Sequence, residues 1–284
     1  MRHVTLSTSV LALSVMSATS LMVLARPAMA ATVYSNGFET NITDWDAFGG
    51  SFNATRVASG TNGITSASGG FYAQSSAAGS ASRWGGYNYG AGNDVPTVFQ
   101  EYTTSVDVYL NVGGGWADNT RFDFSSAINT AAGGHLRDFI FNAGFYGSTD
   151  VTGPGAGTNR FVISASNGSQ PNNAYAKDPG RNPIAISTTG WYTFEHHFYN
   201  NGGTLAVDMK ILNASNVLLN TWTLSSPSDL IGGVGGNRYG WFDLNQFSVL
   251  GFDNALLETA AIPAPGAAAL LGLAGLVATR RRRN

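Results

Sequence analysis

The chain has 284 residues, of which 43% are hydrophobic and 11% charged, and it contains no cysteine. Without cysteine, disulfides, thiolate metal sites and a cysteine nucleophile are excluded, and the fold must be held together by its hydrophobic core. The whole chain has 15 basic and 17 acidic residues, a net charge of −2, but residues 31–260 alone carry −8, the wrong sign for a nucleic-acid partner.

The first thirty residues have the layout of a secretory signal peptide. Arg2 precedes an apolar stretch between residues 10 and 24, and the small-x-small sequence Ala28-Met29-Ala30 follows where signal peptidase is expected to cut. We therefore expect export, with residues 1–30 removed after Ala30. The alternative is a retained N-terminal membrane helix, against which the Ser and Thr residues in the stretch argue.

Residues 31–260 show the alternation of apolar and polar side chains that is typical of β-strands. The expected inward faces of two segments are Val98, Tyr102, Val106, Val108 and Leu110 in VFQEYTTSVDVYLNV, and Leu205, Val207, Met209 and Ile211 in TLAVDMKIL. Further short runs rich in aromatic and β-branched residues lie between turns of Gly, Asn, Pro and Ser. With no capped helical stripe and no fixed repeat, the pattern predicts a single all-β sandwich.

The second half of this body carries a family resemblance. A strand–turn–strand–turn–strand meander, GWYTFEHHFYNNGGTLAVDMKILNASNVLLNTWTL, opens on Gly190-Trp191, and a closing strand, SVLGFDNALLE, follows. The opening segment, VYSNGFETNITDWDAFGG, is similar to the first strand of many jelly-roll modules, in which Phe-Glu precedes a loop with a Trp. The body thus resembles the concanavalin A-like (laminin G-like) fold, which implies an all-β jelly-roll sandwich.

The last segment, residues 261–284, has three parts. Pro263-Ala264-Pro265 precedes an apolar run of 13 residues, 266–278, and the end is marked by Arg280, Arg281, Arg282 and Arg283. At about 1.5 Å per residue, a helix of this run would be about 20 Å long, short of the hydrocarbon core of about 30 Å. Because the arginines would stay on the cytoplasmic side, we expect a short hydrophobic helix with a transient membrane contact.

This layout resembles the PEP-CTERM sorting signal of Gram-negative bacteria, in which a Pro-Glu-Pro-like motif, a short hydrophobic segment and an Arg-rich end follow one another. Ala264 stands where the family usually has Glu, which leaves the exosortase subtype open. The resemblance implies that an exosortase cuts near this motif and that signal peptidase acts at the other end. It places the protein outside the cell, in the envelope or extracellular matrix; an ordinary tail anchor is the alternative.

Two acidic residues near the ends of the body suggest a structural calcium ion. Glu39 in GFET and Asp253 in GFDN occupy matching places, and many jelly-roll modules tie their first and last strands together through calcium held by oxygen ligands. The alternative is that backbone amides satisfy both carboxylates. No other cofactor is expected.

Aromatic side chains in glycine-rich loops are the candidates for ligand binding. Sugar recognition combines aromatic rings with a few polar groups, and the candidate residues are Trp84, Tyr87 and Tyr89 in SRWGGYNYGAGND, Trp116 in GGGWADN, and Arg238 and Tyr239 in GGNRYGW. Their expected partner is an extracellular polysaccharide; the alternative is that each ring folds back onto a sheet end. Residues 31–260 hold nine basic against seventeen acidic residues, a net charge of −8, which argues against a polyanionic partner.

Catalysis is not indicated. A retaining glycosidase needs two carboxylates about 5–5.5 Å apart, and none of the four glutamates is followed by an acidic residue two to four positions later. In FEHHF, Glu195 and His197 share a strand face and could bind a metal, but an ion pair beside a half-buried His196 is the simpler interpretation. The sequence therefore predicts a secreted structural or adhesive protein, with a carbohydrate-binding module as the alternative and a glycan-active hydrolase as the third candidate.

Overall fold

The computed structural model describes residues 31–43, 45, 54–76, 86–89, 98–168, 176–235 and 238–260, with the backbone alone at 87–89, 238 and 239. The chain divides into two compact units, Met29–Ala261 on one hand and Met1–Ala28 with Ile262–Asn284 on the other. The predicted signal peptide and sorting segment lie outside the described residues, and so do Ala30, Pro263, Ala264, Pro265 and Arg280–Arg283. Among the residues described, no helix has the length and apolar character needed to cross a membrane.

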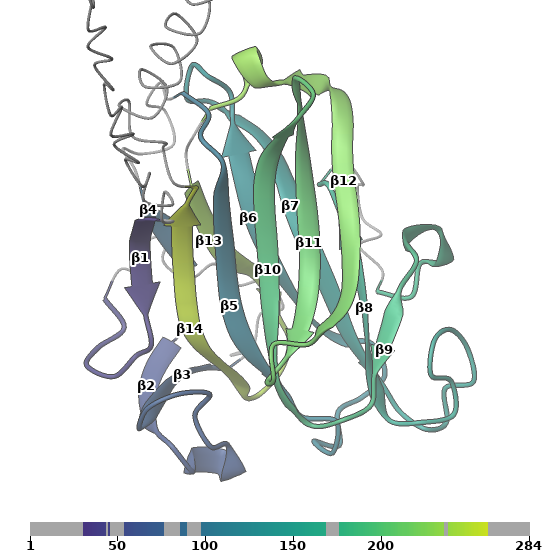
Figure 1. The fold of residues 1–284 in the computed structure, drawn as a ribbon. Coiled ribbons are helices and arrows are strands. Elements are labelled where there is room, and N and C mark those ends of the chain that lie inside the picture. Colours follow the sequence, from purple (N-terminus) through teal and green to yellow (C-terminus); the bar gives the residue numbers. More distant parts are fainter. Residues whose placement is uncertain are drawn as a thin grey trace, which may run out of the picture. The chain divides into compact units, whose positions relative to one another are not determined.

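The described strands form two antiparallel sheets that lie face to face (Figure 1). Sheet A has the order β12-β11-β10-β5-β14-β3-β2, with β1 also pairing with β14, and sheet B has the order β4-β13-β6-β7-β8-β9. The strands of sheet A are β1 (Ala31–Asn36), β2 (Ala54–Ala58), β3 (Phe71–Ser75), β5 (Tyr102–Leu110), β10 (Gly190–Asn201), β11 (Thr204–Asn213), β12 (Leu218–Leu230) and β14 (Leu250–Thr259). Those of sheet B are β4 (Gly86–Tyr89), β6 (Thr120–Asn129), β7 (His135–Tyr146), β8 (Arg160–Ser166), β9 (Ile184–Ile186) and β13 (Arg238–Asn245). The helical turns in the described part are the 3-10 segments η1 (Thr61–Gly63), η2 (Pro179–Arg181) and η3 (Ile231–Gly233).

The chain crosses between the sheets in the manner of a jelly roll. After β4 in sheet B it enters sheet A as β5, returns to sheet B for β6 to β9, forms β10 to β12 in sheet A, and ends with β13 in sheet B and β14 in sheet A. β5 therefore lies between β10 and β14, and β1 pairs with β14 so that Ala31 is opposite Thr259. The prediction of an all-β, concanavalin A-like jelly-roll sandwich is confirmed.

Aromatic rings from both sheets fill the space between them. Phe141 of sheet B meets Phe194 of sheet A edge to face with ring centroids 5.2 Å apart, and Tyr102 stacks on Phe198 at 4.3 Å. Such contacts add specific geometry to the burial of large apolar surfaces. The predicted inward face of β11 is confirmed, because Leu205, Val207, Met209 and Ile211 are all fully buried.

The first turn of the described chain also packs into this core. Phe38 and Trp45 are fully buried, and their rings lie 5.4 and 4.7 Å from that of Phe252 in β14. The Trp-bearing loop that follows the first strand therefore closes one part of the sandwich and presents no ring to a ligand at Trp45.

One strand boundary differs from the sequence prediction. Val98 was expected on the inward face of β5, but the strand begins at Tyr102 and Val98 is 88% exposed. The ladder explains the difference, since β5 begins at Tyr102, which pairs with both Phe198 of β10 and Thr259 of β14, and in the described part of the chain no pairing with either strand extends before it. The remaining predicted inward residues of β5, from Tyr102 to Leu110, are buried as expected.

Candidate functional site

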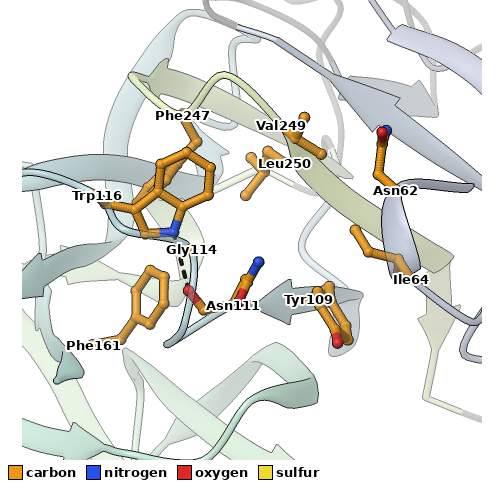
Figure 2. A pocket seen from close by; sticks show the side chains of 10 residues that line it. All are labelled: Asn62, Ile64, Tyr109, Asn111, Gly114, Trp116, Phe161, Phe247, Val249 and Leu250. Atoms are coloured by element: carbon orange, nitrogen blue, oxygen red, sulfur yellow. Dashed lines mark hydrogen bonds between the residues drawn. The ribbon is translucent and has the colours of Figure 1, made fainter.

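A pocket of about 120 Å³ lies at the end of the sandwich where β5 ends (Figure 2). Its apolar wall is formed by Tyr109, Trp116, Phe161, Phe247, Val249, Leu250 and Ile64, and Asn62 and Asn111 add amide groups. These residues come from the β2–β3 loop, β5 and the loop after it, β8, and the β13–β14 connection. We call this the first pocket. Its mixture of aromatic surface and a few polar groups is the usual composition of a small-molecule site.

Trp116 is fixed in this wall by two contacts. Its Nε1 donates a hydrogen bond to the backbone oxygen of Asn111 at 3.0 Å, and its ring meets that of Phe247 edge to face at 5.2 Å. A Cβ at Gly114 would collide with the indole, so the ring lies directly against a glycine backbone. Trp116 remains partly exposed, which combines the two expectations for this residue: the ring folds onto the sheet end and also lines a pocket.

The two amides of the pocket are held by their own neighbourhoods. Asn62 has a positive φ of 54° in the turn η1, and its Nδ2 donates to Gln74 Oε1 at 2.6 Å. Asn111 Oδ1 accepts from the backbone N–H of Gly113 at 3.1 Å, which orients the amide while its Nδ2 keeps donor capacity. Figure 2 shows Asn111 between Trp116 and Tyr109. Oriented amides beside aromatic faces can hydrogen-bond the hydroxyl groups of a neutral ligand.

Of the other predicted aromatic segments, the structure describes only backbone, and this backbone belongs to β4 and β13. Trp84 lies outside the described residues, as do the side chains of Tyr87, Tyr89, Arg238 and Tyr239. Their backbones are nonetheless brought together, since β4 and β13 pair with Arg238 opposite Tyr89. β13 has eight residues, which places its start roughly 25 Å from Phe247 and the first pocket. Trp116 and the β4–β13 residues therefore do not form one site.

Glu39 and Asp253, the predicted calcium pair, meet the same loop between β2 and β3. Glu39 accepts hydrogen bonds from the N–H groups of Gly70 and Phe71, each at 3.1 Å. Asp253 Oδ2 accepts from Ala67 and Ser68 at 3.0 and 3.3 Å. Both carboxylates thus anchor the loop through backbone amides, which is the alternative that the sequence left open.

Asp253 is fully buried, and burial raises its pKa to about 7, against the lowering effect of the backbone N–H groups of Asn254, Ser68 and Ala67. The described residues contain no group of three or more acidic, histidine or cysteine side chains that could hold a metal ion. Backbone amides already donate to the carboxylate oxygens of Glu39 and Asp253. Calcium binding by these two residues stays a prediction.

The histidine-bearing strand β10 divides its polar groups between two faces as predicted. On the outer face, Glu195 pairs with Lys210 at 2.9 Å and His197 Nε2 lies 2.8 Å from Glu101. His196 points inward and is fully rather than half buried, with its Nε2 donating to the backbone oxygen of Phe139 at 3.0 Å. Burial lowers the pKa of His196 to about 3, so the ring is a neutral core group.

The outer face of sheet B holds an acidic cluster that was not predicted from the sequence. Asp123 on β6 is only 6% exposed, and Asp243 lies in the β-bulge of β13 beside it. One oxygen of each carboxylate is buried, and so are Ser125 Oγ and Asn142 Nδ2, the polar groups that face Asp243 and Asp123 respectively. In RFDF and WFDL each Asp lies between two apolar neighbours, so the alternation predicts that its side chain faces away from the core, but it does not predict that the two residues meet.

Known proteins resemble this chain only distantly. No family model and no curated protein matches the chain. Among solved structures, a carbohydrate esterase from Shiga toxin-encoding bacteriophage phi24B matches with a TM-score of 0.48 and 13% identity, covering 82% of this chain and 100% of that one. The CBM2 module of the evolved Dit of Lactobacillus casei BL23 phage J-1 has a TM-score of 0.39 and 12% identity, covering 82% and 97%. Peanut lectin has a TM-score of 0.41 and 10% identity, covering 83% and 99%. These TM-scores lie below 0.5, so the likenesses carry no functional information for this chain.

Proposed function

We propose that the protein is an exported, non-catalytic β-sandwich that binds a neutral glycan in the first pocket and acts as an adhesive component of the cell envelope or extracellular polymer. The observation that carries glycan binding is the juxtaposition of the Trp116 ring with the amides of Asn111 and Asn62 in one accessible pocket. A sugar ring presents an apolar face to an aromatic ring and hydroxyls to amide groups, and the pocket offers both kinds of partner.

The experiment is a binding measurement on the full chain, with a glycan array followed by calorimetry on the best neutral oligosaccharide. The Trp116→Ala variant is expected to lower the affinity by at least about tenfold, because it removes a partly buried aromatic wall. Tyr199→Ala is the matched control, since this ring stacks on His197 on the outer face of sheet A and is not among the residues that line the first pocket. Equal affinities of the Trp116→Ala variant and the wild type, with both folded by circular dichroism, would reject this site.

Export and sorting rest on the two chain ends. The signal peptide-like start and the Pro-Ala-Pro, apolar and Arg-rich end support cleavage by signal peptidase and by an exosortase. Intact mass spectrometry of the protein from its native host is the test. A mature chain that begins after Ala30 and ends near Pro263 is expected, whereas mature molecules that retain Arg280–Arg283 would contradict the sorting proposal.

A further inference from the structure

A second pocket, of about 90 Å³, lies on the outer face of sheet A. Asp107 of β5, Trp191 and Thr193 of β10, and Asn213 and Asn216 at the β11–β12 turn line it. The outer position follows from strand alternation, since Val106, Val108 and Tyr192 on the same strands point into the core. None of these residues belongs to the sets predicted from the sequence.

The carboxylate of this second pocket is held in place from two sides. Thr193 Oγ1 donates to Asp107 Oδ1 at 2.5 Å, and Asn254 Nδ2 donates to Asp107 Oδ2 at 2.8 Å. Asn254 is itself fixed, because its Oδ1 accepts from Ser68 Oγ at 2.7 Å. A carboxylate has about four lone-pair sites, so Asp107 keeps acceptor capacity for a ligand in a fixed orientation.

The β11–β12 turn supplies amide groups opposite this carboxylate. Asn213 Oδ1 accepts from the N–H groups of Ser215 and Val217 at 2.9 and 3.0 Å, which leaves its Nδ2 as a donor. Asn216 is exposed, has a positive φ of 58°, and its side chain makes no hydrogen bond to any residue in the described part of the chain. An acceptor and two amides therefore surround one pocket beside an indole ring.

The two pockets share a wall. Trp191 of the second pocket meets Tyr109 of the first edge to face, with ring centroids 5.3 Å apart. Asp107 and Tyr109 lie two positions apart on one face of β5, a distance of about 7 Å. The β2–β3 loop also spans both, with Ile64 in the first pocket and Ala67 in the second, and Trp191 Nε1 ties the loop down by donating to Thr65 O at 2.7 Å.

We propose that the pocket formed by Asp107, Trp191, Asn213 and Asn216 is a second sugar subsite, so that the protein binds a linear glycan with one unit in each pocket. The inference rests on the proposed glycan-binding function. The Asp107 carboxylate accepts hydrogen bonds from sugar hydroxyls and repels carboxylated units, which makes neutral oligosaccharides the preferred class.

The test measures affinity against chain length on the full protein, with neutral cello-, laminari- and malto-oligosaccharides of one to six units. The wild type is expected to bind a longer member of one series more tightly than its monosaccharide. Asn216→Gly removes the amide without backbone strain, because glycine accepts a positive φ readily. Asn216→Gly and Asp107→Asn are each expected to lower affinity for the longer ligand by about three- to tenfold and to reduce the gain with length.

The matched control is Asn182→Gly, an exposed asparagine with a φ of 48° that lines neither pocket, and its affinity should equal that of the wild type. If Trp116→Ala weakens oligosaccharide binding while Asn216→Gly and Asp107→Asn do not, the second subsite is rejected and the proposed function survives. If no oligosaccharide binds to the wild type, the proposed function and the second subsite are both overturned. Tighter binding of uronic acid oligomers than of neutral ones would also contradict the assignment.

Discussion

Asp123 on β6 and Asp243 on β13 lie side by side on neighbouring strands, with Asp243 as the extra residue of the bulge between Phe242 and Leu244. Burial raises the pKa of Asp123 to about 6, although Arg121, Asn142 and Arg181 lower it. Burial and then the charge of Asp123 raise the pKa of Asp243 well above its usual range, with Asp138 adding to the effect. The fold therefore keeps protons on this face at a pH where exposed aspartates have lost them.

This pair predicts a pH-dependent stability. A carboxyl whose pKa is higher in the folded than in the unfolded state contributes stability that is fully present below about pH 4 and is lost as the pH rises through the folded pKa. The Asp123→Asn variant has no carboxyl to ionise at this position and therefore does not lose this stability as the pH rises. Its free energy of unfolding relative to the wild type should therefore rise by roughly 2–3 kcal/mol between about pH 4 and pH 7. Urea unfolding at both pH values measures the difference, and parallel curves for the two proteins would contradict the buried titration.

His196 should change the free energy of unfolding with pH in the opposite direction. Its pKa is lowered to about 3 by burial, so its contribution is present above the unfolded pKa of about 6.5 and is lost as the pH falls toward 3. NMR of the imidazole carbons should show His196 neutral at about pH 5, in the tautomer that carries its proton on Nε2, because that nitrogen donates to Phe139 O. A titration midpoint between pH 6 and 7 for this ring would show that it is accessible to water.

Arg137 and Asp229 form a two-point ion pair whose loss should be costly. Arg137 Nε and Nη2 lie 2.7 and 3.1 Å from the two carboxylate oxygens of Asp229, which is 1% exposed. Removing one member leaves a largely desolvated charge, so Asp229→Ala should lower the free energy of unfolding by about 3 kcal/mol. Glu195→Gln breaks a more exposed pair with Lys210 and serves as the control, with an expected loss below about 1 kcal/mol. Equal losses for the two variants would show that burial does not set the energy.

Substitution of Gly114 should change ligand binding while leaving the stability of the core almost unchanged. A Cβ at this position would collide with the Trp116 indole, so Gly114→Ala must displace the ring from the pocket wall. We expect weaker glycan binding and altered tryptophan fluorescence. We also expect a midpoint of thermal unfolding within a few degrees of the wild type, since substitutions near the surface usually change stability by no more than about 0.5 kcal/mol. Gly115→Ala is a poor control because Gly115 has a positive φ, whereas Gly113→Ala meets only Asn111 Oδ1 at 3.7 Å and should leave the affinity unchanged.

The strand faces could be predicted from the sequence because alternation is a local property. Leu205, Val207, Met209 and Ile211 follow the alternation of one strand and are buried as predicted. Val98 was predicted wrongly. It fits the alternation of β5, but the neighbouring strands β10 and β14 pair with β5 only as far as Tyr102, and this pairing sets the strand boundary.

The site could be predicted only in part. Trp116 was recognisable because a Trp within glycines is unusual in a loop. Its neighbours Asn62 and Phe247 come from segments far away in the chain, and only the jelly-roll crossings bring them together. For the same reason the pairing of Asp123 with Asp243 has no local signature, since the two residues meet through strand order.

Strand β14 runs from the first pocket to the place where the two ends of the sandwich domain meet. Its last residue, Thr259, pairs with Ala31 at the beginning of β1, while Leu250 at its other end lines the first pocket. Ten residues of strand separate the two, a span of roughly 30 Å. A tether joined either before Ala31 or after Thr259 would therefore be attached at the same end of β14 (Figure 1). The opposite end of β14, where Leu250 lines the first pocket, would be held away from such an attachment, so binding in this pocket should not compete with tethering.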